Sequence, residues 1–160
     1  YLLEHKFSKE VKKANYDYYE KRTLHDSSLS LSTHSILASD IDEKDLAYKL
    51  FQEATKIDLG ENMKTSDHGI HAASLGGLWQ IVVNGFGGVR MVGGNLRINP
   101  KLPENWSRLS FSFMWKGNKL DIELTKEGIK IEVKDEMLEE IEILVYDKKY
   151  VLNQILKIKF

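Results

Sequence analysis

The spacing of apolar residues changes partway along this chain, and this change most constrains its fold. Over residues 43–57, apolar side chains recur every three or four positions, as at Leu46, Leu50 and Ile57. Such spacing places them along one face of an α-helix. From residue 109 onward, apolar and polar residues alternate one by one, which is typical of strands with one buried face. The sequence therefore predicts an α+β chain, with helices first and antiparallel strands after them.

Residues 1–95 are expected to form one helical unit. Two of its expected helices, 27–39 and 69–83, are rich in serine, alanine and glycine. Small residues let another backbone or a ligand approach closely, so both helices are expected to be inner ones, packed on several sides. The other two expected helices are 8–19, with Ser8 as its cap, and 43–57, with Asp40 and Glu43 as a capping pair and Gly60 as its end.

Residues 96–160 are expected to form a second unit, a small antiparallel β-sandwich or jelly roll. The loop 99–103 is expected at the boundary, because its two prolines fit neither a helix interior nor a central strand. Gly85 and the glycine pairs at 87–88 and 93–94 are interpreted as loop residues that lead out of the last helix. The expected strands are 109–115, 120–124, 129–133, 140–146, 149–152 and 156–160.

Composition excludes several classes of function. The 160 residues include 23 basic and 24 acidic ones, and this balance leaves no positive excess to hold nucleic acid. No apolar run reaches the roughly 18 residues of a membrane helix, so we expect no membrane partner and a cytoplasmic location. Cysteine is absent, which excludes disulfides and thiolate metal sites. Because the chain starts at Tyr1 without a methionine, we expect it to be a piece of a longer protein.

The densest polar cluster comes just before the helix expected at 27–39. Ser27 and Ser28 stand at that helix start, where free amide groups and the positive end of the helix dipole attract anions. Arg22 and His25 precede them and could complete a phosphate or sulfate site. Capping of the helix by the same serines explains this pattern equally well, so both interpretations stay open at this point.

Two histidines three positions apart, His68 and His71, form a second candidate site. Side chains at this spacing can share a helix face and ligate a metal. No acidic residue or third histidine stands at a spacing that would complete such a site, so no metal is expected. His71 is instead expected in a polar pocket that faces phosphate, since histidine titrates near neutrality. His68 is expected to lie at the surface or to cap a helix.

Four motifs, in order along the chain, resemble glycoside hydrolase family 65. They are Tyr-Tyr-Glu-x-Arg-Thr-x-His-Asp-Ser-Ser-Leu-Ser at 18–30, Gly-Ile-His-x-Ala-Ser-Leu-Gly-Gly-x-Trp-Gln at 69–80, Asn-Gly-Phe-x-Gly at 84–88 and Pro-x-Leu-Pro-x-x-Trp at 100–106. The likeness runs from about residue 1 to residue 124 and is strongest to the maltose, trehalose and kojibiose phosphorylases. It implies that residues 1–95 are the last helices of an (α/α)6 catalytic barrel and that residues 96–160 are the C-terminal β-sandwich.

The resemblance also implies a reaction. Such a phosphorylase cleaves an α-linked glucose disaccharide, here expected to be maltose, with inorganic phosphate, and gives β-glucose 1-phosphate and glucose. Phosphate takes the place that an activated water has in an inverting hydrolase. The family's general acid lies upstream of this chain, so no catalytic residue is expected here and the chain alone should be inactive. No cofactor is implied, and the partners are the disaccharide, phosphate and a second copy in a homodimer.

Motif position assigns roles to individual residues by resemblance. Ser27, Ser28 and His71 are expected to bind phosphate. Three further residues, Glu20, Arg22 and His25, are expected to contact the substrate or to organise the loop. Two alternatives are a disaccharide hydrolase of the same family and a non-catalytic carbohydrate-binding module formed by residues 96–160, which exposed aromatic residues on one sandwich face would favour.

Overall fold

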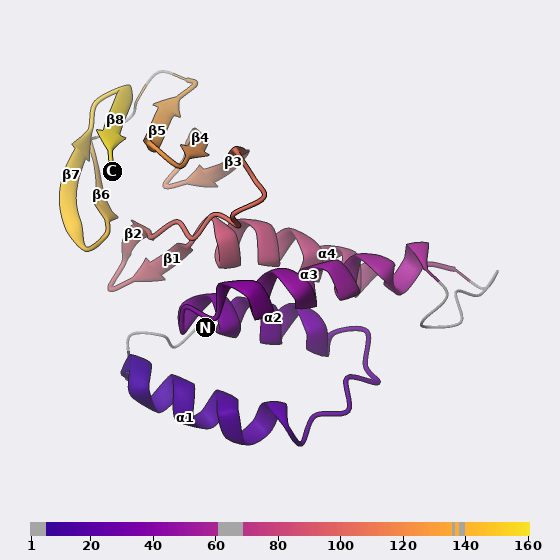
Figure 1. Cartoon of the computed structure of the whole chain (residues 1–160). Helices are drawn as coiled ribbons and strands as arrows, with labels where there is room; N and C mark the ends of the chain where they lie inside the picture. The colour runs from indigo at the N-terminus through magenta and orange to yellow at the C-terminus, as the bar shows by residue number, and fades with distance from the viewer. Residues whose placement is uncertain (1–5, 61–68, 136, 138–139) are drawn as a thin grey trace. The chain divides into compact units, whose positions relative to one another are not determined.

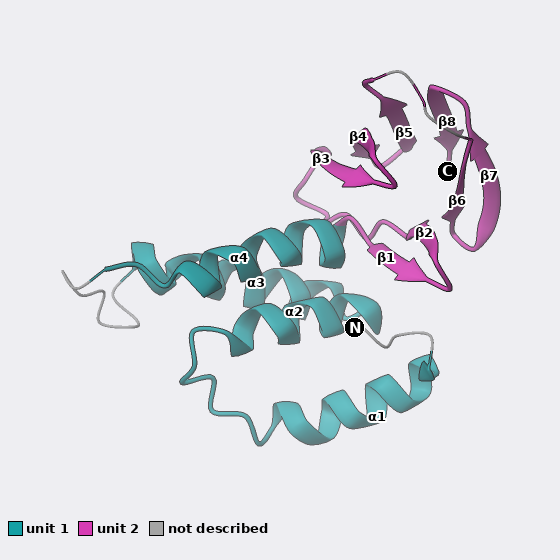
Figure 2. Cartoon of the chain, turned by 180° about the vertical axis from the view of Figure 1, so that it is seen from behind, with its two compact units in different colours: residues 1–86 teal, residues 87–160 magenta. Residues whose placement is uncertain are grey.

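The computed structural model describes residues 6–60, 69–135, 137 and 140–160. It divides into two compact units, residues 1–86 and residues 87–160, shown in separate colours in Figure 2. The first unit is helical and the second consists of strands, which confirms the α+β class. The units separate between Phe86 and Gly87, nine residues before the expected end of the helical unit at residue 95. Within the described residues, no helix is long and apolar enough to cross a membrane.

The described part of the first unit contains four α-helices: α1 (Lys9–Glu20), α2 (Ser30–Asp40), α3 (Lys44–Leu59) and α4 (Ala72–Gln80), the last continued by the π-helical segment η2 (Ile81–Phe86). Ser8 caps α1 as expected, because its Oγ accepts a hydrogen bond from the amide of Val11. Gly60 is the C-cap of α3, also as expected. The expected capping pair before α3 is wrong, since Asp40 is the last residue of α2 and Glu43 makes no side-chain cap hydrogen bond.

Of the two helices expected to be inner ones, α2 is packed on several sides, which confirms the prediction for it. Helix α4 is packed along one side in this chain, because Ser74 and Gly77 are buried while Leu75 and Trp79 are 44% and 53% exposed. Three serines of α2 are buried. Two of them donate hydrogen bonds to carbonyl groups of the neighbouring segments. The fully buried Ser35 donates from Oγ to the carbonyl of Ala47 in α3 at 2.8 Å. Ser39 donates from Oγ to the carbonyl of Gly85 in η2 at 3.0 Å. Since a typical intramolecular hydrogen bond contributes about 0.5–1.5 kcal/mol, these bonds help to hold α2 against both neighbours.

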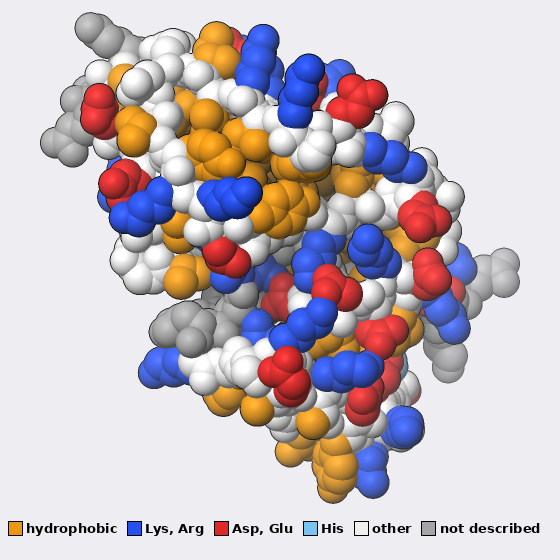
Figure 3. Space-filling view, turned by 60° about the vertical axis from the view of Figure 1, so that its left-hand side comes forward, with side chains coloured by type: hydrophobic (Ala, Val, Ile, Leu, Met, Phe, Trp, Pro, Cys, Tyr) orange, Lys and Arg blue, Asp and Glu red, His pale blue; other side chains and the backbone are white. Residues whose placement is uncertain are grey.

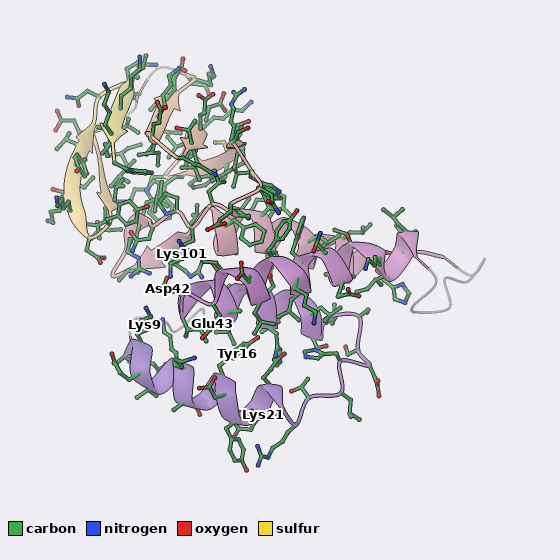
Figure 4. All side chains as sticks on the ribbon, in the orientation of Figure 1. Lys9, Tyr16, Lys21, Asp42, Glu43 and Lys101 are labelled. Atoms are coloured by element: carbon green, nitrogen blue, oxygen red, sulfur yellow. The ribbon has the colours of Figure 1, made fainter. Side chains whose placement is uncertain are left out.

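Helix α1 attaches to the rest of the unit through one buried ring, through ion pairs at the surface and through the part-buried pairs Lys12–Asp40 and Glu20–His34. Figure 4 shows Tyr16 pointing from α1 toward α2, and its side chain is only 6% exposed. Lys9 pairs with Asp42, and Lys13 pairs with Glu43 at 2.6 Å. Exposed ion pairs contribute about 0–1 kcal/mol, so burial of Tyr16 contributes more to this attachment. Burial, together with the charge of nearby Glu20, raises the pKa of Tyr16 above its ordinary value.

Two four-stranded sheets build the second unit, in the strand orders β1-β2-β6-β7 and β3-β4-β5-β8 (Figure 1). The six expected strands are all present, and their bounds differ from the predicted ones by at most two residues at either end. The eight strands are β1 (Val89–Val92), β2 (Asn95–Ile98), β3 (Arg108–Trp115), β4 (Asn118–Thr125), β5 (Gly128–Val133), β6 (Ile141–Val145), β7 (Lys148–Leu152) and β8 (Ile155–Lys159).

Two features of the sheets differ from the sequence expectations. Residues 89–98 form the hairpin β1–β2 and not a loop, with Gly93 and Gly94 in its turn at φ +57° and +79°. This left-handed backbone conformation matches the twist of a hairpin with a two-residue turn, and glycine adopts it without strain. The sheets are also not purely antiparallel, because β2 pairs with β6 in parallel. Since β2 is part of a sheet with β6 and β7, it belongs to the second unit.

Alternating rows of apolar side chains form the core of the second unit. In β4 and β5, Ile122 lies opposite Ile131 in the ladder, and both are buried. The intervening residues of these strands form a charged outer face, as when Lys130 pairs with Glu132 at 2.7 Å within β5. This one-sided burial is what the strict alternation of the sequence predicts.

Candidate functional site

The starts of helices α2 and α4 lie at one end of the helical unit. Figures 1 and 2 show both helices running in the same direction, each beginning where α1 or α3 finishes. The two helices approach closely at Gly77, where an added Cβ would lie 2.6 Å from Ser32 Oγ. The Ser27–Ser28 turn precedes α2 and His71 precedes α4, so the sequence motifs come to the same end.

The turn that carries Ser27 and Ser28 leaves the start of α2 open. The N-cap residue of α2 is Leu29, and no side chain caps the helix. The structure therefore does not support the interpretation that Ser27 and Ser28 cap α2. Ser27 Oγ accepts from the amide of Leu29 at 3.3 Å, and the carbonyl of Ser27 accepts from the amide of Ser30 at 3.2 Å. Among the described residues, the Ser28 hydroxyl has no hydrogen-bond partner. Free amides and an unpaired hydroxyl at a helix start are groups that can bind an anion.

Glu20 lies between two histidines and organises this turn. Its two carboxylate oxygens contact different imidazoles: Oε1 lies 3.3 Å from His25 Nε2, and Oε2 contacts His34 Nδ1. His25 Nδ1 lies 3.0 Å from Ser30 Oγ, which donates at 3.1 Å to the carbonyl of Ser27. A chain of hydrogen bonds therefore runs from Glu20 to the serine turn. Burial raises the pKa of Glu20, but the hydrogen bonds from the two histidines outweigh it, and the net pKa lies below the ordinary value.

The same three side chains are the one group among the described residues with the composition of a metal site. Ligand atoms of Glu20, His25 and His34 all lie within 4.8 Å of one another. Two imidazoles and a carboxylate can ligate zinc or iron. Here, however, each carboxylate oxygen already accepts a hydrogen bond from an imidazole, which satisfies the cluster without an ion. His34, which sequence reasoning missed, is the residue that completes this network.

Arg22 is held at the end of α1 and belongs to the scaffold of the turn. Its Nη1 donates to the carbonyl of Tyr18 at 2.8 Å, and its guanidinium lies 3.9 Å from the centre of the Tyr18 ring. This is a cation–π arrangement. Since α1 ends at Glu20, the contact shields one of its last carbonyls. Of the two roles expected for Arg22, the geometry supports loop organisation.

His71 sits at the N-cap of α4 and is held by Asp58, a residue of α3 that the sequence did not single out. Asp58 Oδ1 lies 2.7 Å from His71 Nδ1, and both carboxylate oxygens accept from the His71 amide, at 3.1 and 3.3 Å. The hydrogen bond from His71 lowers the pKa of Asp58 against the smaller opposing effect of burial. His68, the other histidine of the expected pair, lies outside the described residues.

The second unit has few features of a sugar-binding site. A depression on it is lined by polar and charged side chains without an aromatic one: Glu104, Asn105, Ser107, Thr125, Lys126 and Glu127. The exposed aromatic residues described in this unit, Tyr146 and Phe160, pack edge to face with each other at 5.1 Å, and neither lies within a strand. Figure 3 shows lysine, arginine and acidic side chains interspersed on the face that it displays, without a large area of one sign. Within the described strands no aromatic side chain is fully exposed, and the row of Phe111, Phe113 and Trp115 on β3 is half-buried, which gives little support to a carbohydrate-binding module.

Comparison with known proteins agrees with the motifs. Residues 1–80 match the glycosyl hydrolase family 65 central catalytic domain, and residues 89–152 match the C-terminal domain of that family. Relatives include a kojibiose phosphorylase from Halothermothrix orenii and an alpha,alpha-trehalose phosphorylase from Thermoanaerobacter brockii, each 45% identical over 96% of this chain. The chain spans about a fifth of the length of these curated relatives.

A solved structure is similar along nearly the whole chain. The protein described as "Putative kojibiose phosphorylase from human microbiome" superposes with a TM-score of 0.90 and 38% identity over 98% of this chain, which covers 23% of that protein. The family matches extend over both units and follow the order of helices and strands described above. The chain therefore belongs to glycoside hydrolase family 65.

Proposed function

We propose that this chain is the C-terminal part of an inverting glycoside phosphorylase and that it supplies the phosphate-binding groups. The observation that carries the proposal is the shared location of the Ser27–Ser28 turn and His71 at one end of the helical unit. Hydroxyls, free helix amides and an imidazole are groups that bind phosphate. The relatives described above are named as phosphorylases of α-linked glucose sugars, which supports the same activity.

In the proposed reaction, phosphate attacks the anomeric carbon of the glucosyl group. The bond between that carbon and the glycosidic oxygen breaks as the bond to the phosphate oxygen forms on the opposite face, so the α-linkage becomes β-glucose 1-phosphate. A general acid protonates the departing oxygen and releases the second sugar. We place this acid in a part of the protein outside the present chain, so Ser27, Ser28 and His71 hold and orient the nucleophile.

Kojibiose and trehalose are better candidates than maltose for the disaccharide. The two curated relatives described above are named for kojibiose and trehalose, and the similar solved structure is named for kojibiose. Maltose, which the motifs alone suggested, is not named among them. We infer a disaccharide whose transferred unit is α-linked glucose, with kojibiose first.

We further infer that helices α1 to α4 are part of an (α/α)6 barrel. The helices alternate in direction along the chain, and α2 and α4 share a direction and a close contact (Figures 1 and 2). In such a barrel, the parallel inner helices present their starts at one end. Exposed apolar residues at this end, with Leu59 90% and Ile70 70% exposed, are then surfaces that other helices of the barrel would cover.

The test is an assay of the intact protein on kojibiose, trehalose and maltose, with and without inorganic phosphate. We expect release of the second sugar only with phosphate, together with β-glucose 1-phosphate. An equal rate of glucose release without phosphate would overturn the proposal in favour of a hydrolase. The 160-residue chain alone is expected to show no turnover, and measurable phosphorolysis by it would contradict our placement of the general acid.

A further inference from the structure

Asp58, in the last turn of α3, accepts hydrogen bonds from both the side chain and the backbone of His71. One oxygen, Oδ1, contacts both the imidazole Nδ1 at 2.7 Å and the backbone amide at 3.1 Å. The other oxygen, Oδ2, lies 3.3 Å from the same amide. Because the side chain and the backbone of His71 are held by one carboxylate, both the ring orientation and the start of α4 depend on Asp58.

This arrangement decides which ring nitrogen remains for a ligand. An ionised carboxylate only accepts hydrogen bonds, so Nδ1 of His71 carries a proton. The lowered pKa of Asp58 keeps that carboxyl ionised near neutral pH. Within the described residues, Nε2 of His71 has no hydrogen-bond partner. The Asp58 side chain is 15% exposed and that of His71 is 37% exposed, so the anchor is sheltered while the ring remains accessible.

We propose that Asp58 is a positioning residue for phosphate binding by His71. The inference rests on the proposed function of His71 as a phosphate ligand. Asp58 fixes a proton on Nδ1 and leaves Nε2 on the side of the ring away from the carboxylate. In the neutral ring, Nε2 can accept a hydrogen bond from the hydroxyl of hydrogen phosphate. The carboxylate contacts only the Nδ1 side of the ring, so the imidazole separates its negative charge from that of the phosphate.

A purely structural role of Asp58 is the competing explanation. The same hydrogen bonds tie the end of α3 to the start of α4, so any loss of Asp58 would loosen the connection between these helices. The substitution Asp58→Asn keeps the size of the side chain and one acceptor oxygen while removing its charge. A structural loss alone should affect both substrates equally, so comparing KM for phosphate with KM for the disaccharide separates the two roles. Glu53→Gln is the matched control, since Glu53 lies in the same helix and pairs at 3.1 Å with the exposed Lys56.

The experiment measures steady-state kinetics of the intact protein carrying Asp58→Asn or Glu53→Gln. We expect Asp58→Asn to raise KM for phosphate about tenfold or more, the loss expected for one charge-assisted hydrogen bond. KM for the disaccharide at saturating phosphate should change less than about threefold, on the scale of a loss below 1 kcal/mol. Glu53→Gln should leave both constants unchanged. The proposal would be overturned if Asp58→Asn left KM for phosphate unchanged, or if it raised KM for both substrates by the same factor.

A spectroscopic readout on the intact protein, labelled at histidine, makes the result independent of turnover. Nitrogen-15 chemical shifts of His71 should show the proton on Nδ1 in the neutral ring of the unmodified protein and a changed distribution in Asp58→Asn. An Nε2-protonated ring in the unmodified protein would contradict the positioning role. If the intact protein turned over without phosphate while His71 kept its proton on Nδ1, the proposed function would fail and the Asp58–His71 geometry would stand.

Discussion

Replacing Gly77 by alanine tests the close contact of α2 with α4. An added Cβ would lie 2.6 Å from Ser32 Oγ and 2.8 Å from Ser32 Cβ, which is 0.8 and 0.6 Å short of the 3.4 Å where ordinary contact begins. Ser32 is buried, so it has little room to retreat. Overpacking of this kind costs about 1–3 kcal/mol, against a gain of up to about 1 kcal/mol for alanine over glycine in a helix.

The neighbouring Gly76 is a matched control, because an added Cβ there meets nothing within 4 Å. We expect Gly76→Ala to stabilise the helical unit by up to about 1 kcal/mol and Gly77→Ala to destabilise it by up to about 2 kcal/mol. Urea unfolding followed by helical circular dichroism measures both. Adding Ser32→Gly to Gly77→Ala should recover part of the loss. A Gly77→Ala chain as stable as Gly76→Ala would refute the close contact.

Three further predictions concern other parts of the chain. Ser35→Ala should lower the free energy of unfolding by about 0.5–1.5 kcal/mol, because it removes the buried hydrogen bond from Ser35 to the carbonyl of Ala47; urea titration measures this. Gly94→Ala should cost about 1–2 kcal/mol, because an L-residue then occupies φ +79° in open space, and thermal unfolding of the sheet unit measures it. Asp58→Asn should lower the free energy of unfolding at pH values above the ordinary aspartate pKa of 3.8. The difference in stability from the unmodified chain should shrink as the pH falls through the lowered pKa of Asp58. Urea unfolding at about pH 6 and about pH 2.5 measures this difference.

The sign of this last prediction follows from the direction of the shift. A carboxyl whose pKa is lower in the folded state binds its proton more readily when unfolded, so its contribution to stability is present above the ordinary value. Below the lowered value, both states are protonated and the contribution is lost. A difference between Asp58→Asn and the unmodified chain that grows with acidity would contradict the hydrogen bond between Asp58 and His71.

Local patterns in the sequence predicted those elements whose residues determine their own conformation. Ser8 caps α1 because a side-chain oxygen three residues before Val11 can reach its amide. The hairpins of β3, β4 and β5 follow from strict alternation and short turns. By contrast, Gly93-Gly94 was interpreted as a loop. The flanking residues of β1 and β2 are few and mixed in character, and their pairing is fixed by the distant strand β6.

The candidate site was predicted only in part for a similar reason. Motif resemblance pointed to Ser27, Ser28 and His71, and their roles as phosphate ligands stay predictions. Asp58 stands 13 positions before His71 and in no recognisable motif with it, so only the packing of α3 against α4 reveals the pair. His34 was hidden in the same way, because its contact with Glu20 spans 14 positions. Contacts of this length depend on tertiary packing, which local periodicity does not encode.

The most direct measurement of the central claim is a crystal structure of the intact protein with bound phosphate. We predict an anion within hydrogen-bond distance of the Ser27–Ser28 turn and of Nε2 of His71. Substitution of both serines by alanine should remove it while the helices keep their places. An anion bound elsewhere in a protein that requires phosphate for turnover, with the serine turn and His71 empty, would contradict the assignment of the phosphate site to this chain.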